Sequence, residues 1–131
     1  NNLHMSFRFI KFVPKKKNME ITREQAYNYL HYFSLMGKLE FQFSMAFPKI
    51  FEQAEENVEF FQDDQAIENM AEHIGFVINQ MNLSDSGEDN KTTAIFQAAR
   101  AFVRYLDDKN NPAYCNDDGY WRICSYIARN I

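Results

Sequence analysis

The acidic residues are the side chains most able to do chemistry in this sequence, because they are gathered in one stretch. Residues 50–90 contain eleven Asp and Glu and no Lys or Arg, whereas residues 1–49 carry eight basic and three acidic residues. Eight of the acids lie close together: Glu52, Glu55, Glu56, Glu59, Asp63, Asp64, Glu68 and Glu72. Crowding of like charges costs stability, and a surface of one sign attracts partners of the other. The pattern predicts an acidic surface that binds a basic protein.

One aromatic residue falls within the polar face of the helix that carries the last of these acids. At about 100° per residue, Glu68 and Glu72 turn away from the apolar side, and Phe76 lands beside them. An aromatic anchor with a charged rim is typical of a protein interface, so we predict that Phe76 anchors the partner. In the alternative, another segment of the chain covers Phe76. Arg100 and Arg104, one turn apart on the next helix, would then neutralise the two glutamates.

Inhibitors of nucleases need a surface of this kind. Immunity proteins and antitoxins that occupy the substrate cleft of a nuclease must present negative charge to it, an analogy of electrostatics and not of sequence. We therefore predict a protein-binding inhibitor whose partner is a basic protein such as a nuclease or toxin. The acidic surface itself is not expected to contact nucleic acid.

Residues for catalysis are scattered along the chain. The four glycines form no phosphate-binding loop, the histidines lack the spacing of zinc or di-iron motifs, and no Gly-x-Ser-x-Gly is present. Nothing near Cys115 or Cys124 in the sequence activates a thiol. We predict no enzyme activity, no metal and no cofactor.

Two other functions compete with this prediction. The chain is an enzyme or small-ligand-binding domain if a cavity among Tyr27, His31, Tyr32 and His73 brings a histidine to its wall. It is a homo-oligomeric structural subunit if the apolar side chains of Phe76, Tyr32 and Leu35 meet a second copy.

Helix signals dominate the chain. Thr22 and Gln25 fit a capping box, so a helix is expected to begin at Arg23, with Gly37 as its left-handed C-terminal residue and Phe33 and Met36 on its apolar face. Asp63 or Asp64 caps a second helix, and two more are expected within residues 91–107 and 120–130. Their apolar stripes are Ile67, Met70, Ala71, Ile74, Val77, Ile78 and Met81; then Ile95, Ala98, Ala99, Phe102, Val103 and Leu106; then Tyr120, Ile123, Cys124 and Ile127.

The segment Leu39–Phe47 fits two structures. Its apolar residues alternate as in a strand, which could pair with Met5–Val13 in a short N-terminal β-hairpin, but Leu39, Phe43 and Phe47 also fit a helix, which we favour. Pro48 would kink or divide that helix, with 49–57 continuing it. The expected fold is a mostly all-α, compact bundle of about five helices in a single domain, 1–131.

The expected cellular compartment follows from two features that the sequence lacks. Two cysteines do not make a disulfide framework, and no apolar run reaches the roughly 20 residues of a membrane span. We predict a cytoplasmic protein with no membrane contact. The first four residues, Asn1–His4, are expected to remain from cloning, with the native start at Met5 or Met19.

Overall fold

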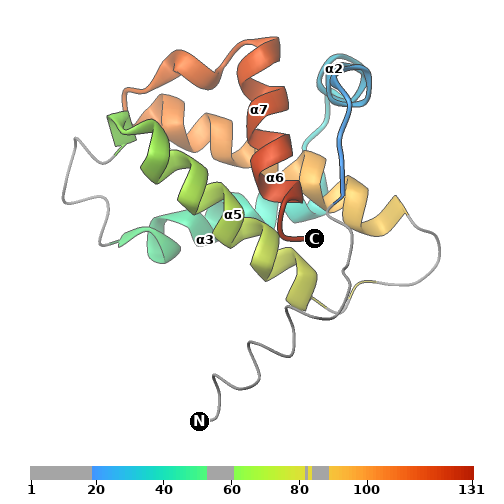
Figure 1. Ribbon diagram of the computed structural model, residues 1–131, viewed down its shortest axis with the longest axis horizontal. Coiled ribbons are helices and arrows are strands. Elements are labelled where there is room, and N and C mark those ends of the chain that lie inside the picture. Colours follow the sequence, from blue (N-terminus) through green and yellow to red (C-terminus); the bar gives the residue numbers. More distant parts are fainter. Residues whose placement is uncertain (1–18, 53–60, 82, 84–88) are drawn as a thin grey trace, which may run out of the picture.

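Helix α6 (Asp89–Asp108) runs through the middle of the molecule and contacts every other helix in the described part of the chain (Figure 1). The computed structural model describes residues 19–52, 61–81, 83 and 89–131. Around α6 lie α2 (Arg23–Tyr32), α3 (Lys38–Ile50), α5 (Asp64–Gln80), the short 3-10 helix η2 (Pro112–Tyr114) and α7 (Asp117–Ala128). The described residues form no strand, and they share one hydrophobic core. The expected all-α bundle is confirmed.

The start of α2 follows from its capping box. The backbone N–H of Gln25 donates to Thr22 Oγ1 (3.0 Å), and the Gln25 side chain accepts from the Thr22 N–H (2.9 Å), so the predicted start at Arg23 is confirmed. The predicted end is wrong, because α2 stops at Tyr32. Gly37 has φ −78°, which is not left-handed, and it is the N-cap of α3.

Helix α3 settles the ambiguity of Leu39–Phe47 in favour of a helix. Glu40, Phe43 and Phe47 are spaced by three and four residues, share one face and are buried, and α3 packs against α6. The strand alternative is wrong here because the buried face has a helical period. Pro48 lies inside α3, which ends at Ile50, while Met5–Val13 and residues 53–57 lie outside the described part of the chain.

Helices α5 and α7 cross at Gly75. Asp63 caps α5, as expected, by accepting from the backbone N–H of Gln65 (3.0 Å). The α5 stripe is buried except Val77 and Met81, which are partly buried, and a Cβ built on Gly75 would lie 2.0 Å from the Ile127 carbonyl oxygen. Only a residue without a side chain allows this close approach.

The other two apolar stripes are confirmed as core. Ile95, Ala98, Ala99, Phe102 and Leu106 of α6 are completely buried, and Val103 is partly buried. In α7 the apolar residues named from the sequence are buried as well, and the Asn116 side chain caps this helix at the Gly119 N–H (2.7 Å). No helix in the described ranges is long and apolar enough to cross a membrane.

Candidate functional site

Apolar side chains stand in solvent where α2 connects to α3, in residues 32–36, which we call the apolar loop. Tyr32 is 78% exposed and Leu35 is 84% exposed, and Phe33 and Met36 are about half exposed. Isolated apolar side chains are ordinary on a protein surface, whereas several together mark a site of interaction. The apolar loop is therefore the first candidate for a contact surface.

Buried charges hold the apolar loop in place. Arg100 donates to both carboxylate oxygens of the completely buried Glu40, from Nε at 3.1 Å and from Nη2 at 2.9 Å. The same guanidinium donates to two loop carbonyls, that of Phe33 and, at 3.0 Å, that of Leu35. Arg104 donates to the second oxygen of Glu40. We call Glu40, Arg100 and Arg104 the Glu40 cluster.

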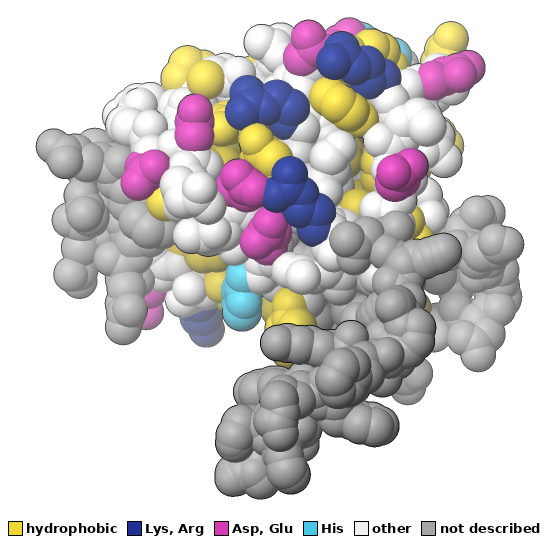
Figure 2. All heavy atoms as spheres, in the orientation of Figure 1, with side chains coloured by type: hydrophobic (Ala, Val, Ile, Leu, Met, Phe, Trp, Pro, Cys, Tyr) yellow, Lys and Arg dark blue, Asp and Glu magenta, His cyan; other side chains and the backbone are white. Residues whose placement is uncertain are grey.

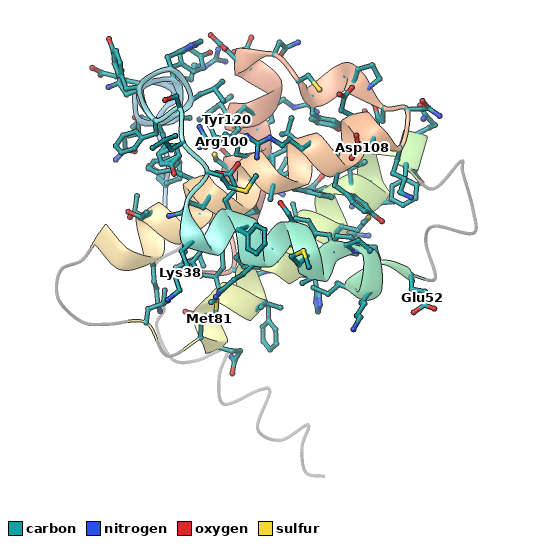
Figure 3. The ribbon with its side chains drawn as sticks, turned by 180° about the vertical axis from the view of Figure 1, so that it is seen from behind. Lys38, Glu52, Met81, Arg100, Asp108 and Tyr120 are labelled. Carbon is teal, nitrogen blue, oxygen red and sulfur yellow. The ribbon has the colours of Figure 1, made fainter. Side chains whose placement is uncertain are left out.

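Neighbouring groups complete the surroundings of the Glu40 cluster. The Arg100 guanidinium lies 5.0 Å from the centre of the Tyr29 ring, and Gln97 Oε1 accepts from the Glu40 N–H at 3.0 Å. Burial by itself lowers the pKa of Arg100, but its hydrogen bonds to Glu40 and the Glu40 charge outweigh burial and raise that pKa above its usual value. Arg100 therefore stays charged. Figure 3 labels it on α6, and its guanidinium reaches the segment that connects α2 to α3.

The Glu40 cluster acts on geometry more than on stability. Taking charges out of water costs about as much as their attraction returns, so a buried ion pair adds little net stability. Arg100 instead joins α6, α3 and two carbonyls of the apolar loop through one rigid fork of donors. Arg100 thus restrains the backbone from which the apolar side chains of the loop project.

A cavity of about 510 Å³ opens beside the apolar loop. Its aromatic part is ordered by stacking, since the Tyr29 ring centre is 4.5 Å from that of Phe33 and 5.0 Å from that of Phe96. No charged side chain is among the described residues of its lining, which are Gln25, Asn28, Tyr29, Phe33, Leu35, Met36, Gly37, Thr93, Phe96 and Gln97. The volume is in the range of ligand sites, and the lining suits a neutral apolar group.

The acidic residues named from the sequence do not form one uniform surface. Glu52 is exposed, Asp63 caps α5, and Asp64 accepts from the Tyr114 hydroxyl at 2.9 Å. Burial and that hydrogen bond raise the pKa of Tyr114 to about 12. The remaining three acids before Glu68, which are Glu55, Glu56 and Glu59, lie outside the described residues.

Arg129 pairs with the last two acids of α5, so its single positive charge offsets one of their two negative charges. Its Nη1 donates to Glu68 and, at 3.1 Å, to Glu72, and Figure 2 shows acidic and basic side chains side by side on the face of α5 and α7. The expectation that Arg100 and Arg104 neutralise these glutamates is wrong, because both arginines pair with Glu40.

Phe76 is 53% exposed on α5. This exposure meets the condition for an anchor, and no segment within the described residues covers the Phe76 ring. Phe76 follows Glu72 by one turn on the same face of the helix, so an apolar group and a carboxylate stand together there.

The alternative enzyme or ligand site, which the sequence predicted among Tyr27, His31, Tyr32 and His73, is only partly assembled. The Tyr27 hydroxyl donates to Asp118 (2.5 Å), and His31 Nε2 lies 3.1 Å from both carboxylate oxygens of Asp117. Tyr32 points into solvent, and His73 is exposed on α5, which packs on α6 and α7. No group of described side chains that could hold a metal ion is found.

The surroundings of the two cysteines do not favour a reactive thiol. Burial raises the pKa of both thiols, Cys115 and Cys124, which disfavours the thiolate that a nucleophile needs.

Asp118 pairs with Arg23 (2.9 Å), whose guanidinium lies 4.3 Å from the Trp121 ring centre. These contacts fasten α2 to the beginning of α7, where acids are favourable.

Sequence reasoning missed Glu40 as the centre of the site. A signal was present, because the helix alternative for Leu39–Phe47 places Glu40 on the same face as Phe43 and Phe47. An acid on an apolar face requires a buried cation, and Arg100 and Arg104 are one turn apart. The pairing itself spans sixty residues, so no local pattern reveals it.

Comparisons with known proteins add no assignment, since no protein-family model, curated protein or solved structure matches this chain.

Proposed function

We propose that this chain is a protein-binding module whose main contact surface is the apolar loop. The observation that carries the proposal is the combination of exposure and restraint: Leu35 and Tyr32 stand in solvent, while Arg100 holds the loop carbonyls. A surface that is already ordered loses less entropy when a partner binds.

The adjoining cavity supports a protein partner with an apolar anchor residue. Phe33, Leu35 and Met36 belong both to the exposed loop and to the cavity lining. Interfaces concentrate affinity where an aromatic or aliphatic side chain fills a pocket that excludes water. An uncharged lining favours a neutral apolar side chain over a charged one.

Substitution of Leu35 by glutamate tests this function. We expect Leu35→Glu to weaken partner binding by about 30-fold or more, because a charge placed at the centre of an apolar contact must be desolvated. The measurement is affinity capture with wild-type and variant protein, followed by titration of the captured protein. The fold is expected to be unchanged, since Leu35 is exposed.

Ala113→Glu is the matched control, because it places the same charge on an exposed position of η2. The control should retain the partner that Leu35→Glu loses. Equal retention of that partner by both variants would contradict the proposal.

A second candidate function is inhibition of a basic protein, such as a nuclease or toxin, through the acidic region 52–76. It is favoured by the exposure of Phe76 one turn after Glu72, and by the exposed Glu52. The pairing of Glu68 and Glu72 with Arg129 leaves one fewer uncompensated negative charge than the sequence suggests. An immunity protein or antitoxin remains the form that this candidate would take.

Phe76→Ala and a salt series test the second candidate. We expect Phe76→Ala to reduce the affinity for a basic partner about tenfold, and we expect binding of the wild type to weaken as salt rises. Met45→Ala is the control, since Met45 is similarly exposed and lies on another helix. A salt-independent affinity, or equal losses in both variants, would count against the acidic region as the contact.

A further inference from the structure

The solvent face of α3 carries apolar side chains that no described segment covers. Phe41 is 56% exposed and Met45 is 64% exposed one turn later, and Pro48 is exposed in the next turn. The opposite face of α3, with Phe43 and Phe47, is the one that is buried. The spacing of three and four residues makes the exposed side chains one continuous stripe.

Opposite charges stand at the two ends of this stripe. Lys38 and Glu52 are both exposed. Lys38 is the first residue of α3, about two helical turns or roughly 10 Å before Met45, and Glu52 follows Ile50, the last residue of α3, by two residues. Figure 3 shows the two side chains at opposite ends of α3. The stripe is therefore complementary in charge to a reversed copy of itself.

We propose that a second copy of this chain packs on the α3 face, antiparallel, with the two-fold axis at Met45. Residues equally far before and after Met45 then meet across the interface, as an isologous contact requires. Lys38 of each copy lies opposite the partner subunit's Glu52, and Phe41 lies opposite the partner's Lys49. Gln42 lies opposite the partner's Pro48.

The charges favour this occupant over a parallel pairing. A parallel arrangement places Lys38 beside the partner's Lys38 and Glu52 beside the partner's Glu52, and like charges across an interface are repulsive. A single helix face buries less area than a standard interface, so we expect a dimer that forms only at high protein concentration. The inference does not rest on the proposed function, because it uses none of the residues of the apolar loop.

Charge reversal on the full chain tests the dimer by sedimentation equilibrium at increasing protein concentration. We expect the wild type to dimerise below about 1 mM, and Lys38→Glu and Glu52→Lys each to weaken the dimer about tenfold, because each creates two like-charged pairs. Mixing the two variants should restore association as a heterodimer, in which both end pairs are again of opposite sign. Native mass spectrometry distinguishes this heterodimer from homodimers.

Met45→Glu provides an independent variant, since it places two carboxylates on the two-fold axis and should abolish the dimer. All three positions are exposed, and circular dichroism confirms that the variants fold. A monomeric wild type at about 1 mM would overturn the proposal, as would single variants that dimerise like the wild type. A dimer that is lost in Leu35→Glu and kept in Lys38→Glu would assign self-association to the apolar loop and overturn it as well.

Discussion

Replacement of Glu40 by alanine is expected to lower the free energy of unfolding by about 3–5 kcal/mol, because it leaves the buried Arg100 charge without a counter-ion. This loss is comparable with a large part of the stability of a small domain. Urea denaturation followed by circular dichroism measures it. A loss of less than about 1 kcal/mol would show that Arg100 reaches water when Glu40 is removed.

Two companion variants separate stability from loop order. Arg104→Ala should cost much less, since Arg104 is half exposed and Arg100 remains on Glu40. Replacing Glu40 and Arg100 together by methionine should recover most of the stability, because an apolar pair avoids the cost of buried charge. That double variant removes the donors to the Phe33 and Leu35 carbonyls, so amide hydrogen exchange in the apolar loop should become faster.

A side chain at Gly75 is expected to separate α5 from α7. Gly75→Ala should lower the free energy of unfolding by roughly 1–3 kcal/mol, and Gly75→Val by more, because the new Cβ would lie 2.0 Å from the Ile127 carbonyl oxygen. Backbone atoms of a packed helix cannot move aside as a flexible side chain does. Thermal and urea denaturation give the measurement.

The sign of the change in the free energy of unfolding is informative for Gly75→Ala, since alanine normally stabilises a helix by about 1 kcal/mol relative to glycine. His73→Ala serves as the control on the same helix, because His73 is exposed and should change stability little. A Gly75→Ala protein as stable as the wild type would contradict the close crossing of α5 and α7.

Local signals in the sequence predicted where helices begin and which of their faces are buried, because both features depend on residues close together in the chain. The capping box of Thr22 and Gln25 placed the start of α2, and Asp63 placed the start of α5. The apolar stripes of α5, α6 and α7 were recognised because a buried helix face repeats every three to four residues. Leu39–Phe47 stayed open because its apolar residues satisfy both periods, and only packing on α6 decided between them.

The sequence predicted less of the candidate site than of the helices. Tyr32 and Leu35 were named as possible contacts with a second copy, but Phe33 and Met36 were assigned to a buried helix face. Their place in a loop depends on Arg100, which lies far along the chain and captures the carbonyls of Phe33 and Leu35. Composition alone does not show such a contact, since it forms only when α6 packs between α2 and α3.

The charge pattern shows the same division. The sequence by itself determined that residues 50–90 are acidic and that the basic residues lie elsewhere. Only the tertiary structure decided the pairing, with Arg129 on Glu68 and Glu72, and Arg100 turned to Glu40. Helix periods and caps are set by residues within one or two turns, whereas ion pairs and exposed surfaces depend on how distant helices pack.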